Sequence, residues 1–279
     1  MKILVTGTNG QVGHALVGAL KDHELISVNR QQCDLTKLDQ IERLIDNHHP
    51  DLIINPAAYT KVDQAEDEVE LAYKVNADAP KLMAKKAREY HIPFIHFSTD
   101  FVFDGKKKDA YKESDPTNPL GIYGSSKLAG EDDIQEVGGQ VYIFRTSWVY
   151  SNVGHNFYLT MKHLSHKRDE LNVVSDQFGV PTSADFIAMQ IHKIIPKLNL
   201  AQPGIFHLVP NGHCSWYEFA REIITKTTPE FDIAKIYPIK AENYPSKASR
   251  PLNSILENTH IKNTFMLEFK DWQSELKKI

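Results

Sequence analysis

Residues 2–13 read KILVTGTNGQVG, an apolar run followed at once by three glycines at intervals of three. This pattern predicts a first strand that enters a tight turn and then a helix over 11–22. Gly7, Gly10 and Gly13 each have a task in such a turn: closing it, admitting a diphosphate close to the backbone, and packing helix on strand. Free N–H groups at the helix start attract phosphates. The stretch therefore predicts a dinucleotide-binding unit that opens an α/β fold.

Apolar runs and amphipathic patterns alternate beyond this turn. Strands are predicted over 2–6, 24–28, 51–55, 93–98 and 140–146. Their nearly continuous hydrophobicity is typical of strands that are covered on both faces. Helices are predicted between them over 11–22, 37–48, 62–90 (in one or two pieces) and 123–137. The alternation predicts right-handed βαβ units and a Rossmann-type, doubly wound parallel sheet.

The pattern loosens after residue 150. Helices are predicted over 154–167, 184–196 and 215–227, and short strands over 171–175, 205–209 and 235–239. We therefore expect a dinucleotide-binding domain over 1–148 and a smaller mixed α/β substrate domain over 149–279. The second half is expected to return partly to the main sheet, so the boundary is interleaved.

Composition excludes several classes of protein. Of 279 residues, 41% are hydrophobic and 24% are charged, and the net charge of −4 argues against a nucleic-acid partner. No apolar run approaches a membrane span, and the chain enters its first strand without a signal-peptide pattern. Cys33 and Cys214 are too few for a disulfide scaffold, and the 13 histidines are scattered. We predict a cytoplasmic protein without a metal site.

The end of the second strand indicates which dinucleotide binds. NAD enzymes tend to place a carboxylate there, whereas NADP enzymes tend to place an arginine. This strand ends at Asn29 and Arg30, which favours NADP(H), with NAD(H) possible; an exposed loop arginine is the alternative. Further cofactor contacts are expected from the loops after the second and third strands, at Asp34, Ala57, Ala58 and Tyr59.

Tyr123 and Lys127 stand four residues apart in GIYGSSKLAGE (121–131), on one face of a predicted helix. An adjacent ammonium lowers the pKa of a phenol, which suits it for general acid catalysis. An exposed cation–π pair is the alternative for this short pattern. Ser98 and Thr99 end the fourth strand at the same sheet edge, where a hydroxyl can reach a carbonyl oxygen. Together these residues predict carbonyl reduction.

Several motifs carry a family resemblance: TGTNGQVG (6–13), NPAAYTKVDQAE (55–66), FSTDFVFDG (97–105), YGSSK (123–127) and FRTSWVY (144–150). They resemble the extended short-chain dehydrogenase/reductase superfamily and, within it, the reductases of dTDP-4-dehydrorhamnose. The similarity continues through GHNF (154–157), DQFGVPT (176–182) and SRPLNS (249–254). It implies NADPH-dependent reduction of dTDP-4-dehydro-β-L-rhamnose to dTDP-L-rhamnose, the last step of dTDP-rhamnose biosynthesis for cell-surface polysaccharide.

The resemblance also implies roles for single residues. Tyr123 matches the proton donor, Lys127 its partner, and Thr99 the hydroxyl that bonds the 4-keto oxygen. Cofactor contacts are expected at Asn9, Gly10, Gln11, Val12, Asp34, Leu35, Ala57, Ala58, Tyr59 and Ser98. Substrate contacts are expected at Asp100 and Trp148, to which the local sequence adds Asn156, Gln177 and Arg250. Phe101 departs from the family's usual Tyr.

Two other functions fit the same motifs. One is an extended reductase or epimerase that acts on another nucleotide sugar. The other is a non-catalytic NADP-binding regulatory subunit, because the regulatory subunits of methionine adenosyltransferase resemble this family. We expect a monomer or a weak homodimer.

Overall fold

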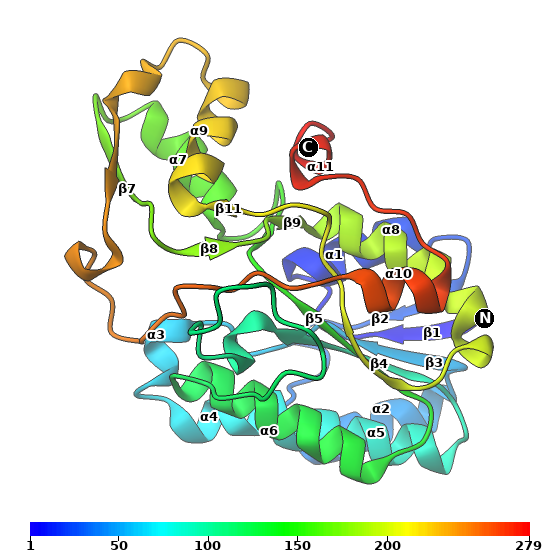
Figure 1. Cartoon of the computed structure of the whole chain (residues 1–279). Coiled ribbons are helices and arrows are strands. Elements are labelled where there is room, and N and C mark those ends of the chain that lie inside the picture. The colour runs from blue at the N-terminus through cyan, green and yellow to red at the C-terminus, as the bar shows by residue number, and fades with distance from the viewer.

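The computed structural model describes residues 1–279 and is built around one six-stranded sheet (Figure 1). All neighbouring strands are parallel, and their order is β2–β1–β3–β4–β5–β10. The strands are β1 (Lys2–Val5), β2 (Glu24–Ser27), β3 (Leu52–Asn55), β4 (Phe94–Thr99), β5 (Val141–Thr146) and β10 (Gly204–His207). The predicted Rossmann-type parallel sheet is confirmed. The strand order reverses between β1 and β3, where ligands of such sheets bind.

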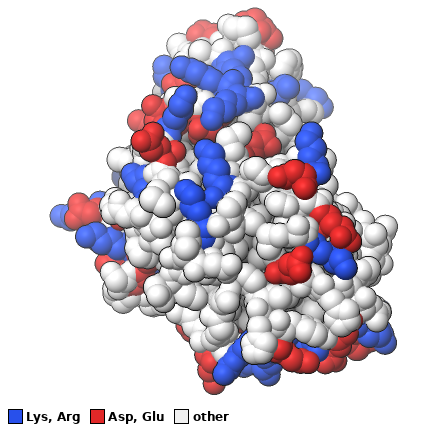
Figure 2. Space-filling model, turned by 90° about the vertical axis from the view of Figure 1, so that its right-hand side faces the viewer, with Lys and Arg blue, Asp and Glu red and all other residues white.

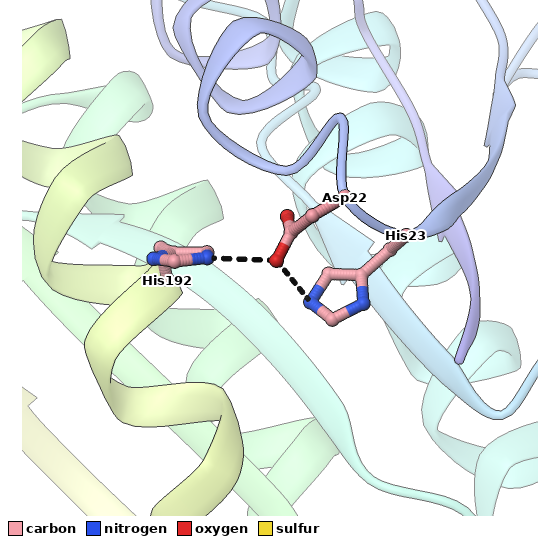
Figure 3. Close-up of side chains that lie close together, drawn as sticks. All are labelled: Asp22, His23 and His192. Atoms are coloured by element: carbon pink, nitrogen blue, oxygen red, sulfur yellow. Dashed lines mark hydrogen bonds and ion pairs between the residues drawn. The ribbon is translucent and has the colours of Figure 1, made fainter.

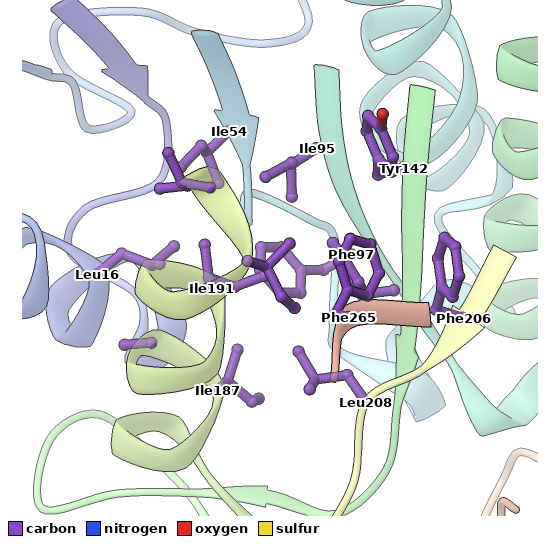
Figure 4. Packing of buried hydrophobic residues seen from close by; sticks show 14 of the residues in the cluster. Leu16, Ile54, Ile95, Phe97, Tyr142, Ile187, Ile191, Phe206, Leu208 and Phe265 are labelled. Carbon is purple, nitrogen blue, oxygen red and sulfur yellow. The ribbon is translucent and has the colours of Figure 1, made fainter. Parts of the chain in front are cut away.

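One face of the sheet is covered by helices from both halves of the chain: α1 (Gln11–Ala19), α8 (Ala184–Ile194) and α10 (Thr259–Phe265). Leu16, Ile191 and Phe265 of these helices pack on Ile54 and Phe97 of the strands (Figure 4). Burying such side chains is the main favourable term in folding. This face of the sheet is therefore completed only by residues far along the chain.

The opposite face is covered by helices from the first half alone: α2 (Leu38–His48), α5 (Ala79–Glu89) and α6 (Ile122–Val137). Ile41, Met83 and Ile134 of these helices contact Leu4 and Ile143 of the strands. α6 carries Tyr123 in its first turn, so its packing positions the predicted chemistry beside the carboxyl end of β4.

The segment predicted as a helix of one or two pieces over 62–90 has four elements, which corrects that prediction. They are α3 (Val62–Ala65), α4 (Val69–Tyr73), the π-helical turn η1 (Lys74–Asp78) and α5. The buried Asn76 in η1 accepts a hydrogen bond from the Tyr59 N–H (2.8 Å) and donates to the Ser126 hydroxyl (3.0 Å). The wider turn thus carries a side chain that joins the Tyr59 loop to α6, and π-turns are frequent at functional sites.

A smaller region over the carboxyl edge of the sheet contains α7 (Phe157–Ser165), α9 (Trp216–Thr227) and the parallel pair β7 (Leu171–Val174) and β12 (Ile236–Ile239) (Figure 1). Its own core joins Tyr150, Tyr158, Phe219 and Ile223. The sequence did not predict α10, α11 (Trp272–Leu276) or the short strands β6 (Val149–Tyr150), β8 (Phe178–Gly179), β9 (Thr182–Ser183) and β11 (Cys214–Ser215). Short 3-10 turns make up the remaining elements: η2 (Asp100–Val102), η3 (Ile195–Leu200), η4 (Ile233–Lys235) and η5 (Ala241–Asn243).

The chain therefore crosses between the two regions more than once, because β10, α8 and α10 belong to the second half but complete the main sheet and its cover. The division into 1–148 and 149–279 stays a proposal. Basic and acidic side chains are interspersed on the face that Figure 2 shows, with basic ones most numerous toward its top. None of the helices has the length and apolarity needed to span a bilayer.

Candidate active site

The glycine turn lies between β1 and α1 at the carboxyl edge of the sheet. Gly7 has a φ of +59°, and a methyl group there would lie 2.8 Å from the Ala57 Cα. A methyl group on Gly13 would overlap the Gly7 carbonyl oxygen. α1 has no acidic residue in its first turn, so its free N–H groups face no competing carboxylate. The turn fits the diphosphate of a dinucleotide.

Gln11 joins the glycine turn to the smaller region. Its Oε1 accepts hydrogen bonds from the Asn156 amide (2.9 Å) and from the Ser151 hydroxyl (3.0 Å). Asn156 also caps α7, since its Oδ1 accepts from the Leu159 N–H at 3.0 Å. A predicted cofactor residue and a predicted substrate residue are thus in direct contact.

The tip of β2 carries the residues predicted to select the dinucleotide. Asn29 Oδ1 accepts the Gln31 N–H (2.9 Å), which shapes the turn. The neighbouring Arg30 is exposed. Arg30 lines a cavity of about 570 Å³ together with Thr36, Glu68 and Lys74. The hydrogen bond from the Thr36 N–H is the largest effect that lowers the pKa of Asp34. The positive charge of Arg30 acts in the same direction.

Replacing Arg30 with Ala should raise the KM for NADPH by about 10- to 100-fold, because a charged hydrogen bond to phosphate contributes about 1.5–3 kcal/mol. The KM for NADH should change little, since NADH lacks the 2′-phosphate. Initial rates with both cofactors check this, with Arg43→Ala on the exposed side of α2 as the control. Equal increases for both cofactors would show that Arg30 does not read the phosphate.

Tyr123 and Thr99 meet at the start of α6. The Tyr123 ring packs edge-on against Phe101, with centroids 5.4 Å apart. Burial raises the pKa of Tyr123 to about 12, a hydrogen bond with Thr99 opposes that rise, and the Asp100 charge adds to it. The expectation that Lys127 lowers the Tyr123 pKa is therefore corrected. The phenol stays protonated at neutral pH, as a proton donor requires.

Lys127 is more deeply buried than Tyr123, and its ammonium makes its contacts away from the phenol. This explains why it does not lower the Tyr123 pKa. Its ammonium donates to the Phe97 carbonyl (2.7 Å) and lies 3.0 Å from His96 Nε2. Burial lowers the Lys127 pKa to about 8, although Glu131 opposes the shift. Lys127 therefore sits near the boundary between its charged and neutral forms.

A buried chain of side chains continues from Lys127 back to β1. His96 Nδ1 lies 3.2 Å from the Asn55 amide nitrogen, and the Thr6 hydroxyl donates to Asn55 Oδ1 at 2.5 Å. Burial, together with the Lys127 charge, holds the His96 pKa well below its usual range, so the imidazole is neutral. The Asn55 amide nitrogen can only donate, so His96 Nδ1 accepts and Nε2 carries the single proton of the neutral imidazole. That N–H faces the Lys127 nitrogen, which can accept it only as a neutral amine.

Sequence reasoning missed these supporting residues. Thr6, Asn55 and His96 end or interrupt apolar strands, and polar residues in such positions are the only local signal that they face a site. Asn76 was missed in the same way, because its partners Tyr59 and Ser126 are 17 and 50 residues away.

Asp100 is a buried carboxyl beside the predicted catalytic pair. Its Oδ1 accepts from the Thr99 hydroxyl at 3.0 Å, whereas Oδ2 has no hydrogen-bond partner. Burial raises its pKa to about 6, with the Ser254 and Thr99 hydroxyls opposing. An unpaired oxygen in such a place is available to a hydroxyl group of a ligand.

Replacing Asp100 with Asn should stabilise the protein by about 2–3 kcal/mol at pH 7.5, because a rise of about two pKa units costs about 1.4 kcal/mol per unit. The folded state binds the Asp100 proton more tightly than the unfolded state does. The loss of stability caused by the ionised Asp100 carboxylate therefore grows as pH rises from about 4 to about 6, and it is absent below that window. Urea unfolding at pH 4 and pH 7.5 measures it, with exposed Asp109→Asn as the control. An equal difference at both pH values would contradict this assignment.

The three other predicted substrate residues lie in the smaller region and the segments that join it. Trp148, at a φ of 47°, stacks on Trp216 with ring centroids 3.5 Å apart, a partner that the sequence did not indicate. Arg250 donates to Asp63 Oδ2 of α3 (2.9 Å), while its Nε has no partner. Gln177 is half-buried and makes no side-chain hydrogen bond.

A buried ion pair lies one helical turn beyond Lys127. Arg145 of β5 donates to both carboxylate oxygens of Glu131, at 2.6 and 3.0 Å. The exposed fractions of the two side chains are 3% and 0%. The guanidinium also lies 5.1 Å from the centre of the Phe103 ring. This pair fixes α6 against the sheet and thereby the position of the helix that carries Tyr123.

Comparisons with known proteins agree over the whole chain. The model of the RmlD substrate binding domain family matches residues 1–279. The dTDP-4-dehydrorhamnose reductase of Burkholderia thailandensis is 39% identical over 98% of this chain and 96% of its own. A crystal structure of a dTDP-4-dehydrorhamnose reductase from Clostridium acetobutylicum has a TM-score of 0.93 at 38% identity, covering 100% of this chain and 98% of its own. That of Bacillus anthracis, in complex with NADP, has a TM-score of 0.93 at 33% identity, covering 99% and 97%.

Proposed function

The chain belongs to the RmlD substrate-binding domain family, and from this premise we propose that it is a dTDP-4-dehydrorhamnose reductase. It reduces dTDP-4-dehydro-β-L-rhamnose to dTDP-L-rhamnose, the last step of dTDP-rhamnose biosynthesis. Related enzymes of this name span the full chain, and one binds NADP. The observation that carries the reaction is the Tyr123–Thr99 pair beside Lys127, at the sheet edge that also holds the glycine turn.

NADP(H) is the preferred cofactor, and NAD(H) remains possible. The glycine turn and the start of α1 would hold the diphosphate, and Arg30 would bind the 2′-phosphate. NADPH, when bound, supplies a hydride to C4 of the keto sugar.

The side chains then manage the charge that develops on the 4-keto oxygen. The Thr99 hydroxyl, which otherwise donates to Asp100, donates a hydrogen bond to that oxygen. Tyr123 gives it a proton, because the phenol is still protonated at neutral pH. Lys127, four residues along α6, is held by the Phe97 carbonyl at 2.7 Å and would donate a hydrogen bond to the nicotinamide ribose of the bound cofactor. Asp100 Oδ2 accepts a sugar hydroxyl, and Trp148, Asn156, Gln177 and Arg250 contact the nucleotide sugar.

The direct test is NADPH oxidation, followed by absorbance, with dTDP-4-dehydro-L-rhamnose made in situ from dTDP-glucose by the preceding enzymes. We expect NADPH loss matched by formation of dTDP-L-rhamnose. NADP binding without turnover of this sugar would favour a non-catalytic subunit. Inversion of a nucleotide sugar with retained NADP would favour an epimerase.

We also propose that the protein acts as a monomer in the cytoplasm. Both cysteines are free thiols buried in the fold, which fits a reducing compartment.

A further inference from the structure

Three potential metal ligands converge at the amino edge of the sheet, away from the glycine turn (Figure 3). Asp22 and His23 lie in the turn between α1 and β2, and His192 lies in the last turn of α8. Asp22 Oδ2 is 3.2 Å from His192 Nε2 and 3.9 Å from His23 Nε2. The three ligand atoms all lie within 4.8 Å of one another.

This spacing matches what a small metal ion requires. Zinc bonds of about 2.0–2.1 Å set tetrahedral ligand atoms about 3.4 Å apart. The two measured separations lie on either side of that value, so small side-chain rotations would complete the triangle. Both imidazoles direct a nitrogen toward the same carboxylate oxygen, as Figure 3 shows.

We propose that Asp22, His23 and His192 bind one transition-metal ion, Zn²⁺ or the chemically similar Co²⁺ or Ni²⁺. Two imidazoles with one carboxylate suit these ions, whereas Mg²⁺ and Ca²⁺ prefer oxygen ligands alone. The side chains are 59%, 20% and 43% exposed, so water completes the coordination.

The ion has a structural role. It joins residues 170 positions apart and ties α1 to α8, which pack on the same face of the sheet. A ligand that binds only the folded state stabilises that state, so saturation with Zn²⁺ raises Tm. Turnover does not depend on the site, because the Tyr123 and glycine-turn residues lie at the opposite, carboxyl edge.

The sequence offered no signal of this site. His192 is remote from the Asp22–His23 pair, and no histidines stand four apart on a helix to suggest a metal. The expectation of no metal site rested on spacing along the chain, whereas the ligands gather only in the folded structure.

The test is a Zn²⁺ titration of the full chain, freed of metal by dialysis, against a chromogenic chelator. We expect one equivalent to bind, with affinity at least about tenfold lower in His192→Ala and in Asp22→Asn, since even outer contacts of metal ligands change affinity 10- to 100-fold. His213→Ala, which removes an exposed histidine elsewhere, should bind as the wild type does. Co²⁺ should give the intense visible bands of four-coordinate geometry in the wild type only.

All three variants alter exposed or half-exposed side chains, so they should fold, and circular dichroism checks this. Unchanged Zn²⁺ affinity in both His192→Ala and Asp22→Asn would overturn the proposal, as would an absence of stoichiometric binding to the wild type. Turnover of the ketosugar is measured separately and decides only the proposed reaction.

Discussion

Replacing Tyr123 with Phe is expected to lower kcat by about 10²- to 10⁴-fold, the usual contribution of a positioned proton donor. The ring contact with Phe101 is kept, but no group remains to protonate the alkoxide. Affinity for NADPH should stay within a few-fold, because the phenyl ring fills the same space. Steady-state rates with the keto sugar and a fluorescence titration with NADPH measure the two quantities.

A matched change is Tyr237→Phe, which removes an exposed phenol from β12 in the smaller region. That variant should keep wild-type kcat. Normal turnover by Tyr123→Phe would mean that another group delivers the proton. Loss of NADPH binding in the same variant would mean that Tyr123 acts mainly through the cofactor.

Replacing Glu131 with Ala should lower the free energy of unfolding by about 3–5 kcal/mol, the cost of leaving a buried charge without its partner. Arg145 would keep only the Phe103 ring beside it, and its Nη1 already lacks a hydrogen-bond partner. Urea unfolding at neutral pH measures the change.

The double variant Glu131→Leu/Arg145→Met separates charge from packing. Apolar side chains of similar volume can replace a buried ion pair at little cost, so most of the lost stability should return. A double variant as unstable as Glu131→Ala alone would show that shape, rather than unpaired charge, dominates at this position. The single exposed change Glu136→Ala, on the same helix, should have little effect.

The sequence predicted the main sheet well because its central strands β3, β4 and β5 are short, apolar and buried along their whole length. In β1, for example, the buried run Ile3–Val5 leads into the glycine turn, where Gly7 has a positive φ and no room for a side chain. α10 was missed because its seven residues include Asn and Thr and show only Ile261 and Phe265 as buried apolar positions. Its stability comes from the aromatic cluster on the sheet, which a local pattern does not reveal.

The candidate site likewise has a part that the sequence predicts and a part that only the fold reveals. Tyr123, Lys127 and Thr99 were predictable because two lie four apart on a helix and the third ends a strand at the same edge. The pKa shift of Tyr123 was not predictable from the sequence. Its direction depends on burial and on where the Lys127 ammonium points. His96 lies 31 residues before Lys127, and only the folded sheet brings their nitrogens within 3.0 Å.

The return of β10, α8 and α10 to the main sheet bears on how the protein matures during translation. When a ribosome has released only the first half, the apolar surface formed by Ile54, Phe97 and Phe144 has no cover from these elements. Domains often fold one after another as the chain emerges. Here the nucleotide-binding sheet must wait for residues near 265 before its second face closes. A nascent chain halted midway would thus expose the apolar surface that these elements cover in the complete fold.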